Sequence, residues 1–193
     1  MNIIIVRHGQ TDWNIEDKLQ GSVNIGLNKT GIQQAKEISK KLSKINIDIL
    51  YSSPLDRAID TAKYINVLRN LNILIDNRLI ERSFGDCEGI NGNKIDIKKY
   101  WDFYKNFSNF NIESIQNLFD RCYQFLIDIC KKYENTNKNI LLVTHNGVNL
   151  AISSIINGYK QNIFDYNLKN CDYRYFENVT KKNLEESYGK FKI

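Results

Sequence analysis

The chain holds only two histidines, and the first, His8, stands in an Arg-His-Gly tripeptide that could react with a phosphate ester. A neutral histidine can attack phosphorus if its second ring nitrogen is fixed by a hydrogen bond. The guanidinium of Arg7 offers a planar fork for phosphate oxygens. Gly9 would let the backbone approach a ligand closely, with its N–H facing an anion. The tripeptide therefore predicts phosphoryl chemistry that needs no metal and no cofactor.

The second histidine, His145, and a further arginine, Arg57, could complete such a site. Together with Arg7 they would stabilise the equatorial oxygens of the phosphoryl group during its transfer. A metal-dependent hydrolase built on both histidines and an acid is an alternative, but the chain has no HxxxH or HxH spacing to support it.

The reaction also needs an acid that protonates the leaving alkoxide. Glu81 is the strongest candidate, because it lies in the glycine-rich segment 79–93. The weaker candidates are Asp86 and Glu88 in the same segment.

Short apolar runs precede most of these residues and predict the strands of a buried sheet. Strands are expected at 2–6, 47–51, 72–75 and 139–143. Apolar residues at steps of three and four predict helices between them, and the clearest helix covers 114–134. Alternation of strands and helices gives an α/β fold with a mainly parallel sheet. Ligands of such sheets bind beyond the carboxyl ends of the strands, which is where both histidines fall.

Other local signals place the remaining elements. Thr30 through Gln33 fits a capping box that opens a helix. Ser53 is expected to be the N-cap of the next helix, with Pro54 at its first helical position. Another helix should run from the turn at His145 to about residue 156. The aromatic-rich stretch at about 94–107 is expected to be helical, and the tail from residue 171 is expected to form one or two short strands.

The composition describes one globular domain over residues 1–193. Hydrophobic residues make up 42% and charged residues 25%, which excludes global disorder. No unbroken apolar run exceeds four residues, as in residues 3–6, so no membrane span is expected. The N-terminus does not have the pattern of a signal peptide.

The cysteine pattern indicates the redox compartment of the chain, and the net charge indicates which partners it favours. The four cysteines have no CxxC spacing, and we expect them to be reduced in a cytoplasmic protein. The formal net charge of +5 mildly favours anionic partners, but the basic residues are too dispersed to predict nucleic-acid binding. The expected partner is a small phosphorylated substrate, with no membrane and no nucleic acid, and the chain is expected to be a monomer or a homodimer.

The stretch RHGQTDWN at 7–14 resembles the signature of the histidine phosphatase superfamily, in its phosphoglycerate-mutase-like branch. Further blocks continue the resemblance in order and spacing over about residues 1–156. These blocks are 20–21 with 27–35, 51–58, 81–89 and 143–148. The resemblance implies a three-layer α/β/α fold with a mainly parallel central sheet.

The resemblance also implies a role for each matching residue. His8 would be the phosphohistidine nucleophile, and Glu81 would be the proton donor and acceptor. His145 would help to hold the phosphoryl group. The implied substrate-binding residues are Arg7, Asn14, Gln20, Gly21, Arg57 and Asn146.

Two departures from the family pattern bear on the function. Cys87 stands where relatives often carry an aromatic residue, which would reshape the pocket wall without removing a catalytic group. Only 63 residues separate Glu81 from His145, whereas phosphoglycerate mutases have a longer insert that covers the site. A shorter lid, expected at about 82–110, would leave the phosphohistidine open to water.

These features predict a metal-independent phosphomonoesterase that acts through a phosphohistidine intermediate. The substrate would be a small phosphorylated metabolite, such as a sugar phosphate, a phosphoglycerate or alpha-ribazole phosphate. A cofactor-dependent phosphoglycerate mutase is the alternative, and a non-catalytic regulator that binds phosphate ligands is a more remote one. The aromatic residues of the lid would be either core or the wall of a substrate pocket. They are Tyr100, Trp101, Phe103, Tyr104, Phe107 and Phe110.

Overall fold

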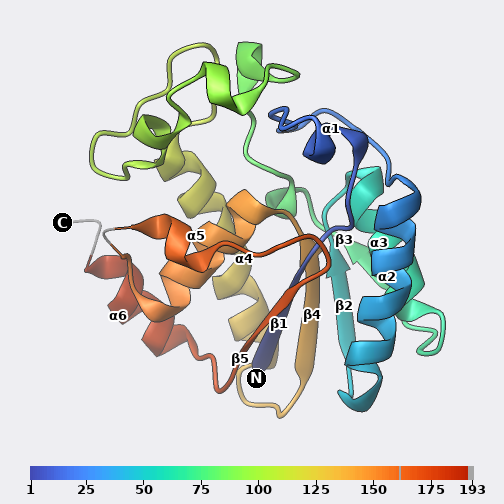
Figure 1. Cartoon of the computed structure of the whole chain (residues 1–193). Helices are drawn as coiled ribbons and strands as arrows, with labels where there is room; N and C mark the ends of the chain where they lie inside the picture. The colour runs from blue at the N-terminus through green and yellow to red at the C-terminus, as the bar shows by residue number, and fades with distance from the viewer. Residues whose placement is uncertain (161, 191–193) are drawn as a thin grey trace.

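A computed structural model describes residues 1–160 and 162–190 and shows a five-stranded sheet between two layers of helices (Figure 1). The strands follow the order β3-β2-β4-β1-β5. Four of them run parallel, and β5 pairs antiparallel with β1 at one edge. The strands are β1 (Asn2–Arg7), β2 (Ile49–Ser52), β3 (Ile73–Ile75), β4 (Asn139–Thr144) and β5 (Tyr173–Phe176). The predicted α/β fold with a mainly parallel sheet is confirmed.

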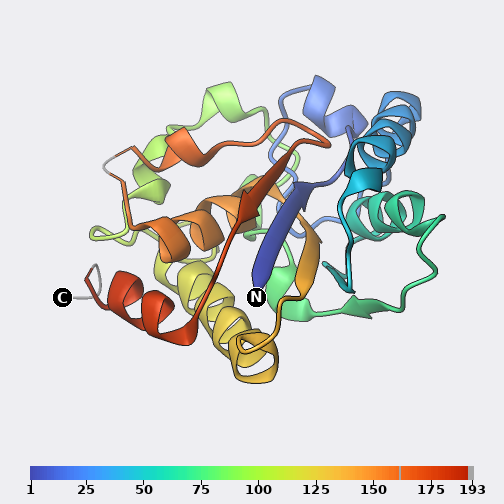
Figure 2. The ribbon, with the colours of Figure 1, turned by 90° about the horizontal axis from the view of Figure 1, so that it is seen from below.

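The helices divide between the two faces of the sheet, as Figures 1 and 2 show from two directions. The α-helices are α1 (Asp12–Ile15), α2 (Lys29–Lys41), α3 (Asp56–Asn66), α4 (Ile115–Tyr133), α5 (Asn146–Asn157) and α6 (Lys181–Gly189). Ile3 and Ile5 of β1 belong to the apolar core under α4, α5 and α6. Ile4 and Val6 belong to the core under α2 and α3. This alternation explains why the strand is apolar throughout, since both of its faces are covered.

Two helices begin elsewhere than predicted. The N-cap of α2 is Asn28, whose side chain accepts a hydrogen bond from the Gly31 N–H at 2.8 Å, so the helix opens before Thr30. The next helix, α3, begins at Asp56 and not at Pro54, and Ser53 does not cap it. The Asp56 N–H donates instead to the side chain of Asn24 at 2.8 Å.

The structure also differs from prediction at the lid and the tail. The stretch 94–107 contains the end of the 3-10 helix Gly92–Lys94 and a short 3-10 helix at Ile97–Trp101, and it is otherwise irregular. The tail does form β5, but it continues into α6, which was not predicted. The other 3-10 helices are Leu42–Lys44, Asn77–Leu79, Gly85–Cys87, Gly92–Lys94 and Ile163–Tyr166.

The four cysteines are buried and have free thiols. Burial raises the pKa of Cys122 to about 12, as expected for a thiol inside an apolar core. In residues 1–160 and 162–190, none of the helices combines the length and the apolar character that a membrane crossing requires.

The loop that follows β1 lies directly on the first turn of α2. A Cβ at Gly9 would lie 2.5 Å from the carbonyl oxygen of Gly31. A Cβ at Gly31 would in turn overlap the carbonyl oxygen of Gln10. The two glycines therefore allow a backbone-to-backbone contact that fixes the chain immediately after His8.

We predict that Gly31→Ala lowers the free energy of unfolding by about 1–3 kcal/mol, because backbone must move to admit the methyl group. Elsewhere in a helix the same change usually stabilises by up to roughly 1 kcal/mol. Gly189→Ala in α6 is the matched control, since a Cβ there meets no atom within 4 Å. Urea unfolding of both variants measures their free energies of unfolding. A change of the same sign in both variants would contradict the close contact inferred at Gly31.

Candidate active site

The residues predicted for the site meet in one hollow of about 220 Å³ at the carboxyl ends of β1 and β4. Among the residues that line it are Arg7, His8, Asn14, Gln20, Gly21, Arg57, Glu81 and Asn146. His145 is the exception, because it is fully buried behind the hollow with its ring centroid 5.1 Å from that of His8. The structure therefore brings together most of the residues that the sequence predicts for the site.

His8 is held as a neutral imidazole with one available nitrogen. Its Nδ1 lies 2.7 Å from the carbonyl oxygen of Gly9. A carbonyl can only accept, so Nδ1 carries the hydrogen and Nε2 keeps its lone pair. Burial lowers the pKa of His8 well below its usual value, and the nearby Arg57 and Arg7 lower it further. The histidine thus has the protonation state that a nucleophile needs.

Gly9 has a different function from the one predicted. Its N–H donates to the Thr61 hydroxyl at 3.0 Å and so does not face a ligand. The expectation that this N–H binds an anion was wrong, because the contact with α2 and the Thr61 hydroxyl determine the placement of the glycine.

Arg57 is completely buried and is held by neutral groups. Its Nη1 and Nη2 donate to the carbonyl oxygens of Val23 and Gly21, each at 2.7 Å. Its Nε donates to Nδ1 of His145 at 3.3 Å. Burial lowers the pKa of Arg57 to about 10, so the guanidinium is still charged at neutral pH.

The tautomer of His145 follows from these contacts. Since Nδ1 accepts from Arg57, the ring hydrogen is on Nε2, which donates to the Ser53 hydroxyl at 2.7 Å. Burial is the main cause that lowers the pKa of His145 well below its usual value. Both ring nitrogens are engaged, so in this structure His145 orients Arg57 and does not face the hollow. The Ser53 hydroxyl also accepts from the Leu55 N–H at 3.4 Å.

One of the N–H donors of Arg7 has no hydrogen-bond partner among the described residues. Its Nη1 donates to the carbonyl oxygen of Leu168 at 2.7 Å. Its Nε is buried and has no hydrogen-bond partner among the residues that the structure describes. Burial lowers the pKa of Arg7 from its usual value. A buried donor without a partner costs free energy, and an anion in the hollow would satisfy it.

Glu81 is fixed at the start of α5 by two backbone N–H groups. Its Oε1 accepts from Arg82 at 2.8 Å, and its Oε2 accepts from Gly147 at 3.1 Å. A Cβ at Gly147 would overlap the Glu81 carboxylate and lie 3.1 Å from the Trp101 ring. The carboxylate and the indole are therefore packed side by side over this glycine.

The weaker acid candidates do not line the hollow. Oε1 of Glu88 accepts from the Ser22 N–H at 2.8 Å and from the Phe84 N–H at 3.0 Å. It thereby joins the loop that holds Arg57 to the loop that follows Glu81. The carboxylate of Asp86 accepts from the side chain of Asn111.

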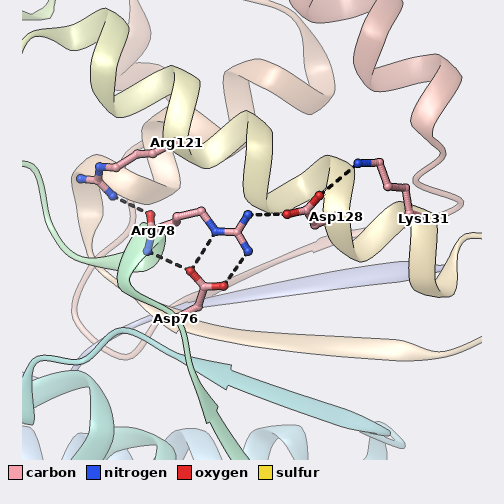
Figure 3. A network of polar contacts seen from close by, with 5 residues as sticks. All are labelled: Asp76, Arg78, Arg121, Asp128 and Lys131. Carbon is pink, nitrogen blue, oxygen red and sulfur yellow. Dashed lines mark hydrogen bonds and ion pairs between the residues drawn. The ribbon is translucent and has the colours of Figure 1, made fainter.

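A network of ion pairs fixes the segment that leads into Glu81 (Figure 3). Arg78 lies between Asp76 and Asp128 of α4, with an N–O distance of 2.7 Å to each. Arg121 of α4 donates to the carbonyl oxygen of Arg78 and pairs with Glu113 at 2.7 Å. The hydrogen bond with Asp76 raises the pKa of Arg78. The segment before Glu81 is thus attached to a long core helix.

Several residues of the site were not predicted. Asn170, just before β5, donates to the carbonyl oxygen of His8 at 3.0 Å and to Asn14 at 3.2 Å. Phe164 lines the hollow from a segment without a strong sequence pattern, whereas Trp101, which also lines it, is one of the aromatic residues expected to be core or pocket wall. Cys87 is buried in the core and does not line the hollow, so the expectation that it reshapes the pocket wall was wrong.

The lining also includes Lys18, Leu19, Phe84, Ile97, Gly147 and Leu150. The aromatic lid residues divide between the two expected roles. Tyr100 and Phe103 are core, and Trp101 is both buried and part of the wall, but Tyr104, Phe107 and Phe110 are exposed and have neither role in this hollow.

A family model described as "Histidine phosphatase superfamily (branch 1)" matches residues 3–188. The chain belongs to this superfamily. It is similar to phosphoglycerate mutase-like protein 4 of Arabidopsis thaliana, with 39% identity over 76% of this chain and 66% of that protein. It is also similar to the uncharacterized phosphatase PhoE of Bacillus subtilis (strain 168), with 36% identity over 81% of this chain and 77% of that protein.

Solved structures agree with this membership. The phosphoserine phosphatase of Entamoeba histolytica, in complex with 3-phosphoglyceric acid, has 31% sequence identity and a TM-score of 0.75. The superposition covers 90% of this chain and 89% of that one. Membership of the histidine phosphatase superfamily and relatives named as phosphatases make this chain a phosphatase-type enzyme.

The neutral histidines of this histidine phosphatase predict loss of stability in mild acid. The usual histidine pKa is 6.5, and in the folded state both values lie well below it. Below about pH 6.5 the unfolded chain therefore binds protons that the folded chain does not. The free energy of unfolding should fall as the pH falls, by up to about 1.4 kcal/mol per pH unit for each histidine.

Urea unfolding between about pH 7 and pH 5.5 measures this slope, and the chain has no other histidines to contribute. His8→Gln removes one titrating group and should reduce the slope. Equal slopes in the two proteins, or histidine ring resonances that titrate normally in NMR spectra, would contradict a neutral His8.

Proposed function

We propose that this chain is a metal-independent phosphomonoesterase that forms a phosphohistidine at His8. The observation that carries the proposal is the neutral His8 with its available Nε2 beside the half-buried guanidinium of Arg7 and the fully buried guanidinium of Arg57. Arg7 Nε has no protein partner among the described residues, so a phosphate oxygen would satisfy it. Glu81 lines the same hollow and supplies a carboxyl group for proton transfer.

The reaction proceeds in two displacements. In the first, Nε2 of His8 attacks phosphorus, the ester P–O bond breaks, and protonated Glu81 gives its proton to the leaving oxygen. Arg7 and Arg57 stabilise the negative charge on the phosphoryl oxygens. In the second, Glu81 takes a proton from water as the water attacks phosphorus, the N–P bond breaks, and phosphate leaves.

We propose that the substrate is a small phosphorylated metabolite. The Entamoeba histolytica relative is named as a phosphoserine phosphatase and holds 3-phosphoglyceric acid. A sugar phosphate, a phosphoglycerate and alpha-ribazole phosphate are further candidates. The residues around the phosphate do not select among them, since they contact only the phosphoryl group.

Phosphoglycerate mutase activity is the alternative outcome. The short connection between Glu81 and His145 favours transfer to water over transfer to a second substrate. An assay with 3-phosphoglycerate and 2,3-bisphosphoglycerate separates the two, because hydrolysis releases phosphate and a mutase forms 2-phosphoglycerate. Efficient formation of 2-phosphoglycerate with negligible release would establish the alternative.

We predict that His8→Ala lowers turnover more than about a hundredfold, because loss of the covalent route costs several kcal/mol. An acid-labile, base-stable phosphoryl label should appear on the wild type and be absent from the variant. Urea unfolding of the variant checks that it is folded. A folded variant that keeps more than about a hundredth of the rate would exclude His8 as the nucleophile.

We predict that Glu81→Gln slows phosphorylation by alkyl phosphates much more than by p-nitrophenyl phosphate. Nitrophenolate leaves without protonation, whereas an alkoxide requires the acid. Rapid-quench measurement of phosphohistidine formation with both substrates tests this. Equal slowing with both would mean that Glu81 only positions the phosphoryl group.

A further inference from the structure

A second and larger hollow adjoins the active site. Its volume is about 880 Å³, and it lies between the lid segment 97–104 and residues 159 and 162–167. Ile97, Trp101 and Phe164 line both this hollow and the catalytic one. The two spaces therefore share a wall, and we call the larger one the annex.

The volumes of the two hollows match different parts of the substrate. Small-molecule sites usually have volumes of roughly 300–1,000 Å³. The catalytic hollow, at about 220 Å³, is below this range and takes a phosphoryl group with a few further atoms. The annex lies within the range and could take an organic group of considerable size.

The position of Glu81 directs the organic group toward the annex. This step rests on the proposed function, in which Glu81 protonates the ester oxygen. The Glu81 carboxylate and the Trp101 ring pack together over Gly147. The ester oxygen must therefore lie beside Trp101, and the group attached to it continues along the shared wall.

Aromatic rings dominate the surface of the annex. Trp101 and Phe164 meet edge to face with ring centroids 5.9 Å apart. Tyr104 and Tyr159 also meet edge to face at 5.9 Å, and Tyr104 is 64% exposed although it is a large aromatic residue. Such rings bind flat apolar groups by stacking and edge contacts.

Several polar side chains of the annex are engaged with protein groups, and the exposed Lys98 adds a positive charge to its lining. The carboxylate of Asp102 accepts from the Tyr104 and Lys105 N–H groups, each at 3.1 Å. Asn162 donates to Asp165 at 2.8 Å, and the side-chain oxygen of Asn167 accepts from Asn146 at 2.8 Å. These contacts engage Asp102, Asn162 and Asn167, so the four aromatic rings form the main surface against which an uncharged organic group can pack.

We infer that the annex binds the organic group of the substrate and selects phosphomonoesters that carry a flat aromatic ring. The catalytic hollow holds the phosphoryl group, and the ring lies between the lid and residues 159 and 162–167. Tyr104 and Phe164 are then residues that determine specificity.

Binding of non-hydrolysable phosphonates tests the inference without requiring turnover. The probes are 3-phenylpropylphosphonate and propylphosphonate, which differ only by the ring, and calorimetry gives both dissociation constants. We expect the wild type to bind the phenyl compound at least tenfold more tightly. Tyr104→Ala should reduce that preference at least threefold. Phe107→Ala is the matched control, because Phe107 is an exposed aromatic residue of the lid that does not line the annex.

Turnover of the corresponding esters separates this inference from the proposed function. If phosphate is released from propyl phosphate but the two phosphonates bind equally, the annex does not bind the ring and the inference fails alone. A preference that Tyr104→Ala and Phe107→Ala change equally would also overturn it. If the phenyl preference holds but no ester is hydrolysed, the proposed function fails and the annex stands as a ligand site.

Discussion

The constraint on which the rest of the site depends is the presence of two guanidiniums, the half-buried Arg7 and the fully buried Arg57, without a carboxylate partner among the described residues. Among the described residues, the hydrogen-bond partners of Arg7 and Arg57 are carbonyl oxygens and one neutral histidine. Burial of a charge is costly unless polar groups surround it. The loops that supply these carbonyls must therefore be held in place, and the positive charge that remains is suited to a phosphate dianion.

The surrounding contacts meet this requirement by connecting separate loops. Glu88 joins the loop of Gly21, which holds Arg57, to the loop that carries Glu81. The ion pairs of Arg78 attach the segment before Glu81 to α4. The contact of Gly9 with Gly31 fixes the chain next to His8. The neutral state of His8 follows from the same environment, since burial and the guanidiniums disfavour a third positive charge.

In the proposed function, the smaller hollow carries out phosphoryl transfer and the annex binds the organic group of the substrate. The catalytic hollow consists of residues at the ends of the strands and of the loops tied to them, where the backbone is fixed on several sides. The annex lies between the lid and the segment before β5, which carry little regular structure. Changes in these segments can alter the organic group that binds without disturbing the groups that contact phosphorus.

The sequence by itself determined the four parallel strands, the long helix α4, the family and most of the polar residues that line the catalytic hollow. These depend on local patterns: β-branched runs form buried strands, and the residues that follow such strands share one edge of the sheet. Only the tertiary structure decided the start of α3, the bond between Ser53 and His145, and the place of Asn170. It also decided that the lid is irregular and encloses an annex. Each of these depends on contacts between residues far apart in the chain, and such contacts override local capping and helix signals.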